Sequence, residues 1–185
     1  MRFTATQELA VEEVAFSWRA RFGPLLRVVD RFEAGAGLLE ARLLGLVPVM
    51  RASGPEVDAG EAMRYLAELP WVPHALVANR QLDWREIDER TVEVGTRVGA
   101  ATAAVRLELD EAGDIVGAST DARPRMEKGR AVPTPWTGRF EAYATLGGIR
   151  VPTHGAVHWE LPDGPFTYWE AEITALEVEA GGITP

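Results

Sequence analysis

The stretch D-A-G-E-A-M-R-Y-L-A-E-L-P-W-V-P-H-A-L, residues 58–76, decides how the rest of the chain is interpreted. Asp58 followed by Glu61 is typical of a capping box at a helix N-terminus. Pro70 has no N–H to donate and disfavours helical geometry at the residue before it, so the helix should end there. An apolar stripe at helical spacing is formed by Ala62, Met63, Leu66 and Leu69. We predict one main helix over about residues 59–69, with this stripe facing a sheet.

The charged side of the predicted helix has a simple interpretation. Arg64 lies three residues after Glu61 and four before Glu68, the spacing of side-chain neighbours on a helix surface. We expect an exposed ion-pair ladder that contributes ~0.2–0.5 kcal/mol per pair.

Outside this stretch the pattern is that of strands. Residues 14–22, V-A-F-S-W-R-A-R-F, alternate apolar and polar side chains with period two. Similar runs, divided by turn residues, predict strands over residues 3–11, 25–33, 38–46, 82–87, 91–98, 101–109, 115–122, 137–145, 149–160 and 166–177. Residues 47–57 are expected to be extended, and residues 123–135, with three prolines, to form a mobile loop.

With no alternation of strands and helices, a parallel sheet is not expected. The prediction is a mainly β (α+β) single domain over residues 1–185. We expect a large curved antiparallel sheet or half-barrel of about 10 strands, with the helix packed in its concavity.

Composition excludes several classes of protein. The formal net charge of -9 argues against binding to nucleic acid or to an anionic membrane surface, since both need clustered Lys and Arg. The absence of cysteine excludes disulfides, thiolate metal sites and cysteine nucleophiles. No run of about 18 apolar residues predicts a membrane-spanning helix, and the N-terminus has no signal-peptide pattern. A cytoplasmic location is expected, although strands that start so abruptly suggest a missing upstream segment.

Several phrases resemble an uncharacterised bacterial family, a domain of unknown function. They are F-S-W-R-A-R-F (16–22), G-A-G-L-L-E-A-R-L-L-G-L-V-P-V (35–49), the segment 54–76 with its R-Y-L-A-E-L-P-W-V-P-H-A-L run, and W-T-G-R-F-E-A-Y-A-T-L-G-G-I-R-V-P-T (136–153). The resemblance implies no activity. It implies a fold similar to that of the LolA and LolB lipoprotein carriers, a curved half-barrel with helices in its concavity.

Six tryptophans suggest an aromatic-lined pocket, because ligand sites are mostly apolar with a few placed polar groups. Packing in the core is the alternative for each of them. Pro70 and Pro73 should hold Trp71 rigidly just after the helix. The predicted ligand-binding residues are Arg64, Tyr65, Glu68, Trp71, His74, Trp84, Arg123 and Trp136.

No catalytic constellation, metal site or cofactor site is predicted. His154 and His158 lie four residues apart on a predicted strand, about 13 Å at ~3.3 Å per residue, too far to share an ion. None of the three serines lies in a G-x-S-x-G sequence. Glu68 and His74 form the one proton-transfer pair considered.

Three functions remain open on the sequence. The first is a non-enzymatic carrier or binding module for a hydrophobic or amphiphilic small molecule. The second is an enzyme that acts on a small substrate in the same cavity, with Glu68 and His74 as proton carriers. The third is a structural or interaction domain with a filled core. The lack of a catalytic constellation favours the first and third.

Overall fold

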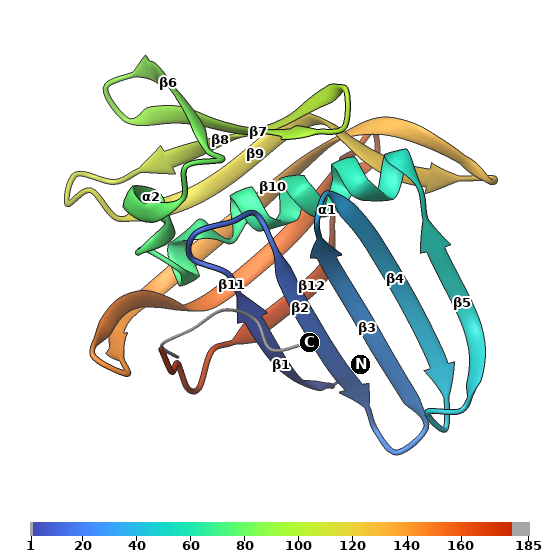
Figure 1. Cartoon of the computed structure of the whole chain (residues 1–185). Coiled ribbons are helices and arrows are strands. Elements are labelled where there is room, and N and C mark those ends of the chain that lie inside the picture. Colours follow the sequence, from blue (N-terminus) through green and yellow to red (C-terminus); the bar gives the residue numbers. More distant parts are fainter. Residues whose placement is uncertain (1, 179–185) are drawn as a thin grey trace.

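The computed structural model describes residues 2–178 and shows two antiparallel sheets with one helix between them (Figure 1). The five-stranded sheet has the order β1-β2-β3-β4-β5, and the seven-stranded sheet the order β12-β11-β10-β9-β8-β7-β6. The first consists of β1 (Thr4–Leu9), β2 (Phe16–Phe22), β3 (Leu26–Glu33), β4 (Ala36–Leu43) and β5 (Val47–Ser53). The second consists of β6 (Asp83–Asp88), β7 (Thr91–Val98), β8 (Ala101–Leu109), β9 (Ile115–Glu127), β10 (Arg130–Leu146), β11 (Ile149–Leu161) and β12 (Gly164–Glu172).

The chain crosses from one sheet to the other through its helical segment. Helix α1 (Pro55–Ala67) is followed by a 3-10 turn, η1 (Leu69–Trp71), and by the single helical turn α2 (Ala75–Ala78). Because α1 packs against β3, β4 and β5 on one side and β7, β8 and β9 on the other, it needs apolar residues on two faces. Accordingly Ala62, Tyr65 and Leu66 are fully buried.

The core lies along α1, between the inner faces of the two sheets. Phe16 and Phe32 supply the five-stranded sheet's side of it, and Val94, Val105 and Leu107 supply the other side. The helix and these side chains fill the space that a half-barrel would leave open.

The prediction of a mainly β protein with one main helix is confirmed, but one large curved sheet is wrong. The strands divide into two sheets because β5 and β6, which flank the helical segment, do not pair with each other. Residues 47–53, expected only to be extended, form the edge strand β5, where Pro48 is tolerated.

The prediction of a mobile loop at residues 123–135 is also wrong, because β9 and β10 continue through it as a long hairpin. Pro124 lies opposite Pro133 in a part of the hairpin that no third strand joins. Pairing of β9 with β8 stops at Ser119, and pairing of β10 with β11 stops at Trp136. Proline removes no hydrogen bond to a neighbouring strand there.

The helix begins earlier than predicted and without a capping box. Gly54 is the N-cap residue and no side chain caps the helix. The Asp58 carboxylate instead accepts the Gly37 N–H of β4 at 2.7 Å, so it joins the helix to the sheet. Glu61 is buried rather than reaching back to the helix end. The end of the helix before Pro70 is as predicted.

Candidate functional site

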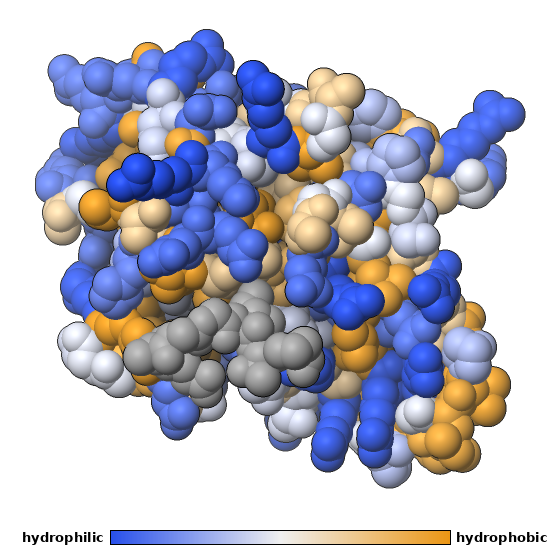
Figure 2. Space-filling model, in the orientation of Figure 1, coloured by the Kyte–Doolittle hydropathy of each residue, from blue (hydrophilic) through white to orange (hydrophobic). Residues whose placement is uncertain are grey.

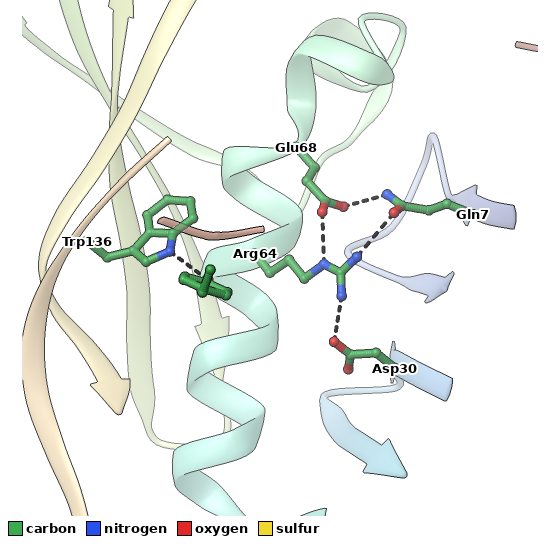
Figure 3. A network of polar contacts seen from close by, with 6 residues as sticks. Gln7, Asp30, Arg64, Glu68 and Trp136 are labelled. Atoms are coloured by element: carbon green, nitrogen blue, oxygen red, sulfur yellow. Dashed lines mark hydrogen bonds and ion pairs between the residues drawn. The ribbon is translucent and has the colours of Figure 1, made fainter. Parts of the chain in front are cut away.

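A buried ion-pair network joins α1 to the five-stranded sheet (Figure 3). The Arg64 guanidinium donates to Asp30 on β3 at 2.5 Å and to Glu68 on its own helix at 2.8 Å. Gln7 of β1 closes the network, since its amide donates to Glu68 at 2.5 Å and its carbonyl accepts from Arg64 at 3.2 Å. Arg64 also lies over the Phe16 ring, 4.7 Å from its centroid.

The prediction of an exposed ion-pair ladder is wrong, because these side chains are buried. Of its two predicted pairs, the structure contains the one between Arg64 and Glu68. The side chains of Arg64 and Glu68 are only 15% and 11% exposed. One guanidinium pairs with both carboxylates, although Oδ1 of Asp30 has no hydrogen-bond partner among residues 2–178. The network functions first as a connection between the helix and strands β1 and β3.

Glu61 lies one turn before Arg64 and is buried without a hydrogen bond to its Oε2 atom among residues 2–178. Burial and the nearby Asp30 carboxylate raise the pKa of Glu61 to about 8, although the charges of Arg123 and Arg64 act in the opposite direction. Its methylene group packs against β4 at Gly37, where an added Cβ would lie 3.1 Å from it. Burial thus favours the protonated, neutral form of the Glu61 side chain.

A β-bulge in β9 turns Arg123 toward the interior. Trp136 pairs with Thr120, and Thr134 pairs with Arg123. The step from Thr120 to Arg123 advances three positions along β9, whereas the opposite step from Trp136 to Thr134 advances only two along β10. The extra residue places Arg123 on the same face of the sheet as Trp136, and bulges commonly re-aim a side chain in this way. Arg123 is only 8% exposed, and its guanidinium lies 5.0 Å from the centroid of the Trp136 ring.

Aromatic side chains continue from Trp136 across β11 and β12. The Trp136 indole N–H donates to the Tyr168 hydroxyl at 2.8 Å, and Tyr168 stacks on Trp159 with ring centroids 5.6 Å apart. Arg125 lies 6.0 Å from the centroid of the Trp159 ring. We call Arg123, Arg125, Trp136, Trp159 and Tyr168 the Arg123 cluster.

The Arg123 cluster is open to solvent at one end and contains an unsatisfied donor at the other. Tyr168 is 43% exposed and the Arg125 side chain 31% exposed. By contrast the Nη1 atom of Arg123 is buried and has no hydrogen-bond partner among residues 2–178. A buried guanidinium without a partner costs free energy, and an anion in hydrogen-bond reach would remove that cost.

The predicted binding residues fall into separate places. Arg64 and Glu68 contact each other, as do Arg123 and Trp136, but Figure 3 shows Arg64 and Trp136 on opposite sides of α1. The structure thus brings together two pairs rather than one pocket.

Tyr65 and Trp71 are occupied by partners within the chain. The Tyr65 hydroxyl donates to the Ala10 carbonyl at 2.7 Å and accepts from Asn79 at 3.0 Å. The Trp71 indole N–H donates to the Pro152 carbonyl at 2.9 Å, and its ring packs edge-on against Phe140. Both side chains connect the helical segment to the sheets.

His74 and Trp84 lie apart from both pairs. His74 immediately precedes α2 and is exposed, whereas Glu68 is buried in the network with Arg64. Trp84 is 43% exposed on β6, an edge strand of the seven-stranded sheet. The Glu68–His74 pair therefore has one member in contact with solvent and one committed to a buried cation.

Sequence reasoning missed Asp30 and Gln7 in the network, and Arg125, Trp159 and Tyr168 in the Arg123 cluster. Asp30 carried a usable signal, since it occupies an inward position of the alternating strand L-R-V-V-D-R-F-E (26–33). The bulge that redirects Arg123 has no comparable signal.

No group of three or more potential metal-ligating side chains occurs within residues 2–178. His154 is held by carboxylates instead, with Nε2 3.0 Å from Glu170 and Nδ1 3.7 Å from Glu141. None of the helices in the described part of the chain has the length and apolar character required to cross a bilayer.

The fold and its two polar groups define a two-sheet β protein with a buried ion-pair network and a half-open cluster of arginine and aromatic side chains. The chain belongs to a family of unknown function, DUF6544, whose model matches residues 1–171. This agrees with the resemblance to an uncharacterised family, and it brings no activity with it. Comparison with curated proteins and with solved structures gave no match.

Proposed function

We propose that the protein binds an anionic, amphiphilic small molecule at the Arg123 cluster. The observation that carries this proposal is the buried, unpartnered Nη1 atom of Arg123. A carboxylate or phosphate is the complementary group, because guanidinium forms its strongest hydrogen bonds with such oxygens.

The aromatic residues define the rest of the ligand. Trp136 holds the Arg123 guanidinium in place through its ring, and the stacked pair Trp159 and Tyr168 extends an apolar surface outward to solvent. A ligand with an anionic head and an apolar body fits this arrangement, with its head at Arg123 and its body along the aromatic rings.

A hollow of modest size lies on the same hairpin, although none of the residues of the Arg123 cluster lines it. It lies between the start of α1 and the β9–β10 hairpin, has a volume of about 540 Å³, and is lined by residues that include Glu56, Pro124, Met126 and Pro133. Small-molecule sites commonly have volumes of roughly 300–1,000 Å³. Pro124 directly follows Arg123 in the sequence. Pro133 directly precedes Thr134, the residue that lies opposite Arg123.

The filled interior changes the kind of binding module we propose. Because α1 occupies the space between the sheets, the ligand lies at the margin of the seven-stranded sheet and not inside an enclosed barrel. Transport of such a ligand, the role of the lipoprotein carriers whose fold the family resemblance implies, is part of the proposal.

Native mass spectrometry combined with tryptophan fluorescence tests the proposal. The probes are dodecanoate, dodecyl phosphate and the uncharged dodecanol, each titrated into wild-type protein, Arg123→Gln and the matched control Arg97→Gln. Arg97 is an exposed arginine on β7. We expect the anionic probes to bind wild type and Arg97→Gln, with roughly tenfold or greater weakening in Arg123→Gln, the loss of one charge-assisted hydrogen bond.

Equal binding of dodecanol and dodecanoate, or unchanged affinity in Arg123→Gln, would overturn the assignment of Arg123 as the anion site. No binding of any probe, together with greater stability of Arg123→Gln, would favour the third hypothesis, a structural domain with a filled core. Hydrolysis of the bound phosphate ester, dodecyl phosphate, would favour the enzyme hypothesis.

A further inference from the structure

Six exposed arginines share the face of the five-stranded sheet that points away from α1. They are Arg19, Arg21, Arg27, Arg31, Arg42 and Arg51. The face is assigned by alternation, because Trp18, Ala20 and Asp30, which alternate with them, are buried on the helix side. No helix of the described residues, 2–178, covers this outer face.

Three of these arginines stand in one row across the sheet. Arg21 on β2 lies directly opposite Arg27 on β3, which lies directly opposite Arg42 on β4. Like charges in directly opposed positions destabilise a sheet. Of the three, Arg42 alone has an ion-pair partner within residues 2–178, Glu40 at 2.6 Å. Arg21 and Arg27 thus face each other without a neutralising carboxylate among residues 2–178, an arrangement that an external anionic partner would relieve.

Residues 1–53 are less acidic than the rest of the chain. The first 53 residues contain seven arginines and six acidic residues, whereas the whole chain has a net charge of -9. The argument from net charge against an anionic surface therefore does not apply to this sheet.

An apolar tip lies directly beside the arginine row. The β2–β3 and β4–β5 turns meet there, joined by a hydrogen bond of 2.5 Å from the Leu44 N–H to the Leu25 carbonyl. Leu25 is 54% exposed, Leu44 58% and Leu46 77%. Figure 2 shows apolar residues gathered at this end of the sheet, at the lower right, beside hydrophilic side chains that follow the strands.

Leu44 adopts a backbone conformation that leucine rarely takes. Its φ angle is 54°, in the left-handed region that favours glycine. An exposed leucine gains little from packing that would offset this strain, which favours a role for its side chain outside the folded chain.

We propose that this end of the five-stranded sheet docks on an anionic lipid bilayer. Leu25, Leu44 and Leu46 enter the boundary between head groups and acyl chains, and the row formed by Arg21, Arg27 and Arg42 contacts the lipid phosphates. Arg27 lies two residues from Leu25, and Arg42 two residues from Leu44, or about 7 Å at ~3.3 Å of rise per residue. This spacing matches the order of apolar and anionic layers at a bilayer surface.

A bilayer suits this surface better than a protein partner does. The tip consists of two adjoining turns at the end of a sheet (Figure 1), so a protein would need a matching apolar hollow surrounded by acidic groups. A fluid anionic surface provides both features without a specific shape. The residues of this docking surface are separate from the Arg123 cluster. The result of one test therefore does not decide the other proposal.

Vesicle flotation tests the docking surface. Wild-type protein is mixed with phosphatidylcholine vesicles that contain or lack phosphatidylglycerol. The first variant, Leu44→Gly with Leu46→Ser, removes the apolar tip and relieves the φ strain, so it should fold. The second, Arg21→Gln with Arg42→Gln, removes charge from the row. Matched controls are Val77→Ser, at an apolar residue 92% exposed on α2, and Arg97→Gln.

We expect wild type and both controls to float with the phosphatidylglycerol vesicles only. Binding should weaken roughly tenfold or more in the leucine variant and about fivefold for each arginine removed, with unchanged near-ultraviolet circular dichroism. Wild type that fails to float, or variants that float as well as wild type, would overturn the proposal. So would self-association of wild type without vesicles that the leucine variant abolishes, since the tip would then be an interface between two copies of the chain.

Discussion

Arg64 and Glu68 form an ion pair of 2.8 Å within one turn of α1, and both side chains are almost completely shielded from water. The same guanidinium also neutralises Asp30 on β3. One cation thus serves two buried carboxylates, so its removal affects more than a single pair.

Arg64→Met should lower the free energy of unfolding by about 3–5 kcal/mol, because it leaves two buried carboxylates, Asp30 and Glu68, without the cation that pairs with them. Urea denaturation measures the change. The control Arg85→Ala breaks a pair with Glu93 whose arginine is 67% exposed, and should cost less than about 1 kcal/mol. If Arg64→Met costs no more than this control, the network has no stabilising role. Adding Asp30→Asn and Glu68→Gln to Arg64→Met should recover part of the loss.

Glu61 should make stability depend on pH between its ordinary pKa of about 4.5 and its folded value of about 8. In this range the unfolded chain releases the proton and the folded chain keeps it. The contribution of Glu61 is therefore complete below about pH 4.5 and is lost as pH rises toward 8, with a slope of up to ~1.4 kcal/mol per pH unit. Urea denaturation at several pH values measures this slope, and Glu61→Gln should flatten it. An unchanged slope in Glu61→Gln would assign the dependence to other groups.

Trp71 and Gly155 should show strong coupling in a double-mutant cycle. A Cβ at Gly155 would lie 2.7 Å from Cζ2 of Trp71, so Gly155→Ala must displace a buried indole and should cost about 1–3 kcal/mol. Trp71→Ala should cost about 3–5 kcal/mol by leaving a cavity. In the double variant the Gly155→Ala cost should vanish, because the indole is absent. Strict additivity of the two free energies would show that the contact is not the cause.

Arg123→Met should leave the free energy of unfolding unchanged or raise it by up to ~1–4 kcal/mol, because it replaces a buried guanidinium, whose Nη1 atom has no hydrogen-bond partner among residues 2–178, with an apolar side chain of similar length. Thermal denaturation of the protein without added ligand measures this. A clear loss of stability would mean that the contact of Arg123 with Trp136 outweighs the cost of its burial.

Much of the fold could be predicted from the sequence, because alternation of side chains is a local property. Strand β2 was predicted to end at Phe22, where the structure ends it, and the helix ends before Pro70, at Ala67, two residues short of the predicted end at Leu69. Asp58 shows where local reasoning fails. Its position suited a cap, but a backbone N–H of Gly37, distant in sequence, is its partner.

The candidate site was less predictable, because it depends on register and on burial. A one-residue bulge decides that Arg123 points inward, and no residue type marks that bulge. Likewise the spacing of Arg64 and Glu68 is the same for an exposed pair and a buried one. Asp30, on a strand 34 residues away, makes the difference.

The sheet topology has a consequence for how the chain folds. Each strand pairs only with strands next to it in sequence, in two uninterrupted meanders. Short loop closures of this kind favour rapid folding for a β protein. The helical region makes most of the contacts between segments that are distant in sequence. One example is the hydrogen bond from the Trp71 indole to the Pro152 carbonyl. We therefore expect sheet formation to be fast and local, and docking of the helical region between the two meanders to be the slow, rate-limiting step.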